Sequence, residues 1–225
     1  QLAALKQYAA AHQNKAEQDY NYQYAGDVTI CRSDSNFLSF VRGVNSFTAD
    51  AEGYSYDSRT GEALKLSQVV KDMNRLQDAV DEVLKENGQG ERAAIAKEAL
   101  SKDAIVWALG NEGLELFIAQ SDGSYVDYRR IVVSYERYPE LFQEGVTLRP
   151  AEYAAQLMTT GKNYIDGKVV QVNAPETEGG SFTVTVDDKQ FTVEKPEMAG
   201  GLISLLYVKK GTNTYLYPEF RGDYS

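Results

Sequence analysis

Residues 68–86 read QVVKDMNRLQDAVDEVLKE, and this stretch decides the fold class that the sequence predicts. Its apolar residues recur at steps of three and four, which places them on one stripe of a helix. They are Val69, Met73, Leu76, Val80, Val83 and Leu84. Ser67 can cap the first turn, and glycines at 88 and 90 end the pattern. We therefore expect one long amphipathic helix whose apolar stripe packs against another layer.

Patterns typical of strands lie on both sides of this helix. Runs of β-branched and aromatic residues are separated by short polar turns, of which 33–36 and 57–61 are the clearest. The expected strands span 28–32, 37–44, 54–56, 63–66, 104–109, 114–119 and 131–135. Shorter helices are expected over 2–20 and 92–100. The predicted fold class is α+β, with a mixed or antiparallel sheet packed by one long and one or two shorter helices.

The C-terminal residues show a different pattern. A helical stretch is expected over 151–158, where Pro150 suits a first helical position. All remaining elements are expected to be strands, over 168–172, 182–186, 191–194, 202–208 and 214–217. We therefore predict two domains, an α+β domain over residues 1–146 and a small β-rich module over 147–225, with the second packed against the first because its own core is small.

Composition and charge restrict the class of partner. The chain has 225 residues and a net charge of −10, and residues 1–146 hold most of that charge, with 23 acidic and 15 basic side chains. Such a balance disfavours nucleic acid, which needs clusters of Lys and Arg, and favours a cationic partner. No apolar run reaches the roughly 18 residues of a membrane span. The chain begins at Gln1 without Met, so we expect a trimmed or mature form.

The sequence contains no assembled catalytic motif. His12 is the only histidine and Cys31 the only cysteine, so neither a disulfide nor a His or Cys metal cluster can form within one chain. Cys31 lies in a β-branched run and is expected to pack as a small hydrophobe. Paired carboxylates of the glycosidase type cannot be singled out among 33 acidic residues. We expect no cofactor, no metal and no enzymatic activity.

Tyrosine is unusually frequent, with 16 residues. Tyr20, Tyr22 and Tyr24 alternate along the chain, as do Tyr54 and Tyr56. Tyrosine gives a large contact area at a small cost in conformational entropy, which favours binding surfaces. Tyrosine is also a good strand former, so a single Tyr can equally cover a half-buried sheet. As a population, these residues favour a binding protein over an enzyme.

Three segments resemble motifs of one known family. They are RSDSNFLSF at 32–40, YDSRTGEALKLS at 56–67, and NEGLELF at 111–117 followed by IVVSY at 131–135. Together, over residues 1–145, they resemble the extracellular domain of the lysozyme-sensing (RsiV-like) anti-sigma factors, a domain of secreted Gram-positive bacterial proteins. The resemblance implies an extracellular or cell-surface α+β domain that performs no catalysis and binds lysozyme. A family segment, Tyr-Thr-Gly-Gly-Ala-His, has no counterpart here, where residues 46–53 read SFTADAEG.

Function is therefore expected to be binding or sensing, with a cationic protein such as lysozyme or a cell-wall component as the ligand. The alternative is an accessory domain of a cell-wall-modifying enzyme of the peptidoglycan deacetylase type. The best candidate for the contact is the stretch 47–56, which combines acidic and aromatic side chains in an expected exposed turn. The candidate partner-binding residues are Phe47, Asp50, Glu52, Tyr54 and Tyr56.

Overall fold

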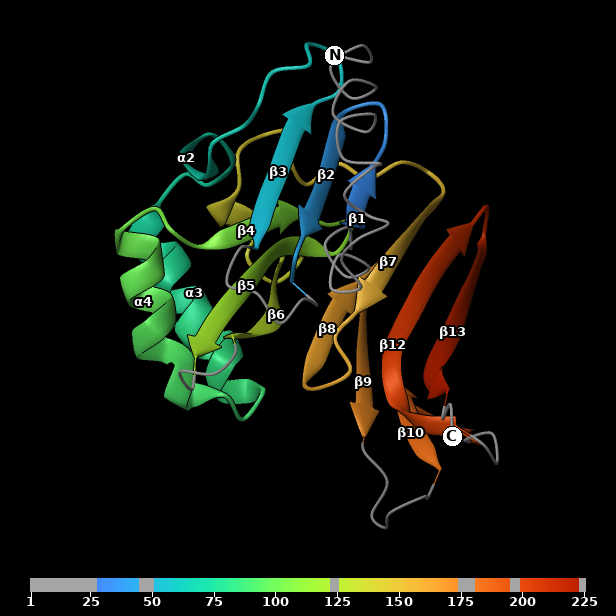
Figure 1. Cartoon of the computed structure of the whole chain (residues 1–225). Coiled ribbons are helices and arrows are strands. Elements are labelled where there is room, and N and C mark those ends of the chain that lie inside the picture. The colour runs from blue at the N-terminus through green and yellow to red at the C-terminus, as the bar shows by residue number, and fades with distance from the viewer. Residues whose placement is uncertain (1–27, 45–50, 122–125, 174–180, 195–198, 223–225) are drawn as a thin grey trace, which may run out of the picture.

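The computed structural model describes residues 28–44, 51–121, 126–173, 181–194 and 199–222. Half of the described residues lie in strands. These residues form thirteen strands in four small antiparallel sheets, together with three short α-helices (Figure 1). None of these helices is long and apolar enough to cross a membrane. The helix predicted over 2–20 lies outside the described residues.

The first sheet has the strand order β1-β2-β3. Its strands are β1 (Val28–Ser33), β2 (Phe37–Arg42) and β3 (Glu52–Asp57). The predicted turn at 33–36 is confirmed, and the Asp34 carboxylate stabilises it by accepting hydrogen bonds from the amides of Asn36 and Phe37 at 2.7 and 2.9 Å. Along β2, alternate side chains are buried, as expected for a sheet with one face toward the core.

The second sheet has the order β4-β5-β6 and is covered by the helices. Its strands are β4 (Val106–Leu109), β5 (Gly113–Ser121) and β6 (Val126–Ser134). The helices are α2 (Leu66–Val69), α3 (Met73–Glu86) and α4 (Ala93–Ser101), with short 3-10 helices at Gly90–Arg92 and Pro139–Leu141. The apolar stripe of α3 is buried against this sheet in the largest core cluster.

The long helix predicted over 68–86 begins only at Met73. Asp72 caps it by accepting hydrogen bonds from the amides of Asn74 and Arg75. Residues 68 and 69 belong to the separate short helix α2, and the helix is interrupted after them because Val70 forms an isolated antiparallel bridge with Phe142. Tertiary pairing at Val70 therefore overrides the helical spacing and divides the predicted helix in two.

The C-terminal part consists of two further sheets packed face to face. One has the order β13-β12-β7 and the other β11-β10-β9-β8. The strands are β7 (Tyr153–Leu157), β8 (Lys162–Ile165), β9 (Lys168–Asn173), β10 (Phe182–Val186), β11 (Lys189–Val193), β12 (Ala199–Lys210) and β13 (Asn213–Gly222). Their inner faces share one core, in which Val170, Leu205 and Tyr207 are buried.

The helix predicted over 151–158 is wrong, because this stretch contains strand β7. Tyr153, Ala155 and Leu157 are buried on the inner face while Ala154 and Gln156 are exposed, which is the period of two expected for a strand. Pairing of β7 with β12 satisfies its backbone. The helix-forming Ala and Gln residues of this stretch are therefore placed in a strand by tertiary pairing.

The predicted α+β class is also wrong. The chain is mostly β, all strand pairs among the described residues are antiparallel, and no single mixed sheet is packed by a long helix. The physical reason is that the helices cover only the β4-β5-β6 sheet, whereas the other sheets bury their apolar faces mainly against sheets. The division into domains at residue 146 stays a prediction.

Buried polar side chains join the two parts of the molecule. Arg32 on β1 is fully buried and donates to the carbonyl of Val146 at 2.9 Å and to that of Leu148. Asn111 donates to the carbonyl of Ala154 at 2.8 Å, at the edge of β7. Each of these contacts gives a backbone carbonyl a hydrogen-bond partner, and the contact at Ala154 takes the place of strand pairing at that point of β7.

Candidate binding surface

The candidate surface is the outer face of the β1-β2-β3 sheet. The antiparallel register places Phe40 between Ile30 on β1 and Tyr54 on β3, and it places Leu38 opposite Tyr56. We call these five side chains the aromatic face. Because side chains alternate along a strand, the neighbouring positions of β2 point to the opposite side, where they are buried.

Ring stacking organises this face. The rings of Phe40 and Tyr54 lie 5.1 Å apart at 22°, and those of Phe40 and Tyr56 lie 6.4 Å apart at 24°. Ile30 is 65% exposed and Leu38 is 38% exposed at the margins. Single exposed apolar residues are common, but contiguous ones on a single sheet face mark an interaction surface more specifically.

One end of the aromatic face carries a charge-balanced cluster. The Arg42 guanidinium contacts the Glu52 carboxylate at 2.7 Å, and the Tyr54 hydroxyl donates a hydrogen bond to the same carboxylate. This hydroxyl and the guanidinium lower the pKa of Glu52, and the same hydrogen bond raises the pKa of Tyr54. At neutral pH the ion pair is therefore fully charged and locally neutral, so Glu52 offers no unpaired negative charge to a partner.

The inner side of the sheet fixes this surface to the rest of the molecule. The Leu109 amide donates to the Ser39 hydroxyl at 2.8 Å, and that hydroxyl lies 2.6 Å from the Ser55 hydroxyl. On β3, Gly53 lies so close to β4 that a Cβ built there would meet the Trp107 carbonyl oxygen at 2.1 Å. Only glycine permits this approach of the two backbones. The outer face is therefore supported by a fixed backbone.

The structure brings together three of the five predicted partner-binding residues. Glu52, Tyr54 and Tyr56 alternate along β3 and share its outer face. Tyr54 and Tyr56 lie in a strand as predicted over 54–56, whereas Glu52, expected in an exposed turn, begins the same strand. Phe47 and Asp50 lie outside the described residues. Sequence reasoning missed Ile30, Leu38 and Phe40 as members of the surface. The alternation in β2 signals that Leu38 and Phe40 share a face, but their pairing with β3 depends on long-range register.

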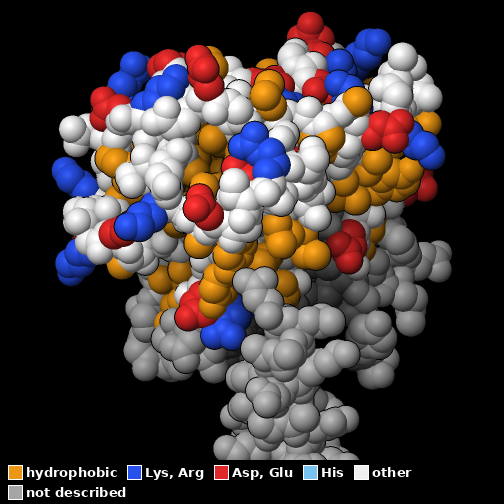
Figure 2. Space-filling model, turned by 90° about the horizontal axis from the view of Figure 1, so that it is seen from above, with side chains coloured by type: hydrophobic (Ala, Val, Ile, Leu, Met, Phe, Trp, Pro, Cys, Tyr) orange, Lys and Arg blue, Asp and Glu red, His pale blue; other side chains and the backbone are white. Residues whose placement is uncertain are grey.

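On the face of the molecule seen from above, the charges are mixed in sign (Figure 2). Figure 2 shows acidic and basic side chains interspersed over the upper surface, with hydrophobic side chains gathered between them. On this surface no single sign of charge dominates (Figure 2).

Among the described residues no group of three or more His, Cys, Asp or Glu side chains could hold a metal ion. His12 lies outside the described residues. Cys31 is free and half-buried, and burial raises the pKa of its thiol, so the neutral thiol predominates at neutral pH.

Glu112 is the most unusual titratable group. It is buried, its Oε1 accepts a hydrogen bond from the Tyr164 amide at 3.2 Å, and its Oε2 has no hydrogen-bond partner. Burial raises the pKa of Glu112 to about 8, against the opposing effect of the nearby Arg130. The carboxyl group is therefore mostly protonated at pH 7, where it links the start of β5 to β8.

No protein-family model matches the chain, and no curated protein sequence matches it.

Proposed function

We propose that this chain is a non-catalytic, extracellular binding module that holds a protein partner on its aromatic face. The observation that carries the proposal is the stack of Phe40, Tyr54 and Tyr56, which are partly exposed on one face of a sheet whose other face is fixed to the core. The extracellular location and the absence of catalysis are proposed from the resemblance to the lysozyme-sensing domains.

The geometry favours a preorganised interface. Aromatic side chains have few rotatable bonds, and these rings are already stacked, so little conformational entropy is lost when a partner covers them. The hydrogen bonds beneath Ser39 and the close approach at Gly53 hold the strands in place. A partner can therefore bury aromatic area without first ordering the surface.

The partner that we propose is a cationic protein of the lysozyme type. Its attraction at long range comes from the net charge of −10, because Arg42 neutralises Glu52 on the face itself. Binding should thus separate into two effects. Charge governs the association rate, and burial of the rings governs the dissociation rate.

Surface plasmon resonance on immobilised C-type lysozyme tests the proposal. Between about 0.05 and 0.5 M salt the Debye length falls from roughly 14 to 4 Å, so the association rate should fall more than the dissociation rate rises. Tyr54→Ala should raise the dissociation rate by about 10- to 30-fold, as expected for a central aromatic anchor. The melting temperature of the Tyr54→Ala chain reports any loss of folding.

Phe191→Ala is the matched control. Phe191 is a 51% exposed aromatic residue on β11, in a different sheet, and its removal should leave the kinetics unchanged. No binding of the wild-type chain at about 100 μM and low salt, a concentration at which affinities of about −5.5 kcal/mol are detected, would reject lysozyme as the partner. Equal effects of the two variants would reject the aromatic face.

A further inference from the structure

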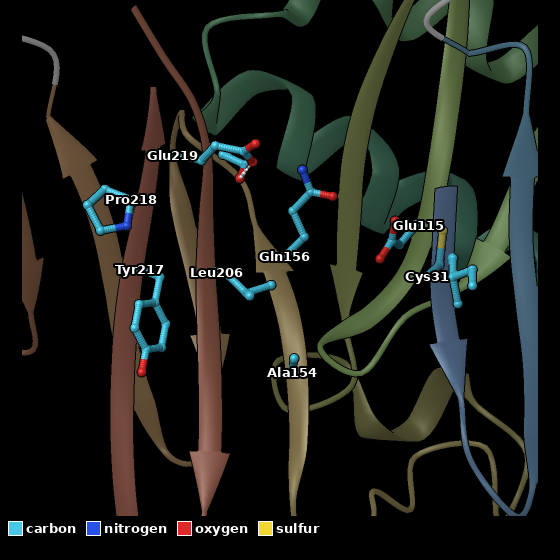
Figure 3. A pocket seen from close by; sticks show the side chains of 10 residues that line it. Cys31, Glu115, Ala154, Gln156, Leu206, Tyr217, Pro218 and Glu219 are labelled. Carbon is cyan, nitrogen blue, oxygen red and sulfur yellow. Dashed lines mark hydrogen bonds between the residues drawn. The ribbon is translucent and has the colours of Figure 1, made fainter. Parts of the chain in front are cut away.

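A second surface lies along β1, the edge strand of the first sheet, where a groove of about 440 Å³ opens toward another sheet (Figure 3). Ile30 and Cys31 of β1, with Glu115 of β5, form one wall. The outer face of the β7-β12-β13 sheet forms the other. The volume lies within the roughly 300 to 1,000 Å³ of small-molecule sites.

The wall on β12 and β13 combines an aromatic ring with an aliphatic side chain. Leu206 pairs with Tyr217 across the two strands and with Gln156 on β7, so the three side chains form one row. Leu206 is 36% exposed and Tyr217 is 54% exposed, whereas the neighbouring Leu205 and Tyr207 are buried on the inner face. The Tyr217 ring is therefore available as a flat surface.

The Tyr217 ring stacks against a second tyrosine ring. Tyr215 is exposed on the same strand, and its ring lies 6.2 Å from the Tyr217 ring at 26°. Stacking limits the rotamers that both rings can adopt, so the orientation of Tyr217 is largely set before a ligand arrives.

Polar groups lie beside the ring. Among the described residues, the Gln156 side-chain amide has no hydrogen-bond partner, so it offers both a donor and an acceptor. The Glu219 carboxylate accepts a hydrogen bond from the Ser204 hydroxyl at 2.8 Å through one oxygen, and its other oxygen has no hydrogen-bond partner among the described residues. Figure 3 shows Gln156, Leu206 and Glu219 around the same opening.

The charges exclude anionic ligands. The described lining contains no Lys or Arg, and its two acidic side chains are Glu115, which Arg130 neutralises at 2.7 Å, and Glu219. A phosphate or carboxylate would find no cation in this lining. A suitable ligand is neutral, has flat apolar faces that stack on a ring, and has hydroxyl groups at its edges for an amide and a carboxylate.

Sugar rings have this combination of groups. Their axial C–H groups form apolar faces that are attracted to the negative face of an aromatic ring, and their equatorial hydroxyls donate and accept hydrogen bonds. We propose that the groove binds a neutral oligosaccharide, with one sugar ring stacked on Tyr217 and the hydroxyls of the bound sugar bonded to Gln156 and Glu219. This site is separate from the aromatic face, and the two surfaces share only Ile30.

Isothermal titration of the full chain with two tetrasaccharides tests this proposal, one of N-acetylglucosamine and one of glucose. At least one should bind, and the stronger ligand shows whether acetamido groups add to the affinity. Tyr217→Ala should weaken binding of that ligand at least tenfold, whereas Tyr217→Phe, which keeps the ring, should stay within about threefold. Gln156→Leu should also weaken binding and serves if Tyr217→Ala does not fold.

Tyr54→Ala and Phe191→Ala are the controls and should bind the sugar like the wild-type chain. The proposal is overturned if neither tetrasaccharide gives a heat of binding at about 5 mM. At that concentration even affinities of about −4 kcal/mol give partial saturation. Undiminished binding by a folded Tyr217→Ala chain would also overturn the proposal. Neither outcome affects the protein partner proposed for the aromatic face, because Tyr54 does not line the groove.

Discussion

Replacing Glu112 with glutamine should change how the stability of the protein depends on pH. Glu112 is buried, and its pKa is raised from 4.5 to about 8, first because burial penalises the charged form. Between these two pH values the folded chain keeps the proton that the unfolded chain has lost. The free energy of unfolding therefore falls as pH rises through this window, and the contribution is fully present only below pH 4.5.

The size of the effect follows from the shift. Each pKa unit corresponds to about 1.4 kcal/mol, so the shift from 4.5 to about 8 gives a total of about 5 kcal/mol. The side chain introduced by Glu112→Gln cannot ionise, and its oxygen can still accept the hydrogen bond from Tyr164. Its NH2 group replaces the unpartnered Oε2, which adds a cost that does not vary with pH.

Urea unfolding of both chains at half-unit steps from pH 4.5 to 9 measures this difference. The stability of Glu112→Gln minus that of the wild-type chain should rise by up to about 1.4 kcal/mol per pH unit and level off above pH 8. Other titrating groups are common to both chains and cancel. A difference that stays constant across the range would show that Glu112 is ionised in the folded protein, which would refute the reasoning.

Two substitutions and one reactivity measurement test the framework that supports the aromatic face. Arg32→Met should lower the free energy of unfolding by about 3 to 5 kcal/mol in urea titrations, because it leaves the Asp34 carboxylate and two carbonyls without their cation. A loss under about 1 kcal/mol would contradict the role of Arg32 as their buried partner. Gly53→Ala should lower the free energy of unfolding by about 2 kcal/mol or more, since the added Cβ meets the Trp107 carbonyl. A melting temperature equal to that of the wild-type chain would show that β3 and β4 can move apart at no cost. Cys31 should react with a thiol reagent at pH 8 at least about tenfold more slowly in the folded chain than in urea, because burial favours the neutral form of its thiol. Equal rates would show that the thiol is accessible and ionises as in the unfolded chain.

Local sequence signals were enough to predict most elements of the N-terminal part. Asp34 and the short polar residues beside it fix the first turn by side-chain to backbone hydrogen bonds, which act within three residues. The stripe from Leu76 to Leu84 is helical for an equally local reason. These elements depend on contacts between near neighbours in the chain.

The arrangement of the strands could not be predicted in the same way. Residues 153–157 contain good helix formers and become a strand only because β12, about 50 residues later, pairs with them. The same holds for Val70, whose partner is Phe142. Local preference is a weak guide where long-range pairing decides the outcome, and for this reason the helical content was overestimated and the β class missed.

The candidate surface was predictable only where it depends on local alternation along one strand. The alternation of Glu52, Tyr54 and Tyr56 signals a shared strand face, and this is what the structure shows. The contribution of Ile30 and Phe40 requires the register of three strands, including a bulge in β1 between Ile30 and Arg32 that sets which side chains face outward. The groove at Tyr217 depends on two sheets meeting, which no local pattern encodes.

Hydrogen exchange of the chain alone and saturated with C-type lysozyme tests most directly whether the aromatic face is the partner surface. Amides of β2 and β3 beside Phe40 and Tyr54 should exchange more slowly in the complex, while those of β11 stay unchanged. Protection confined to β12 and β13, or no change in β2 and β3 despite saturation, would contradict the assignment of the partner to the aromatic face.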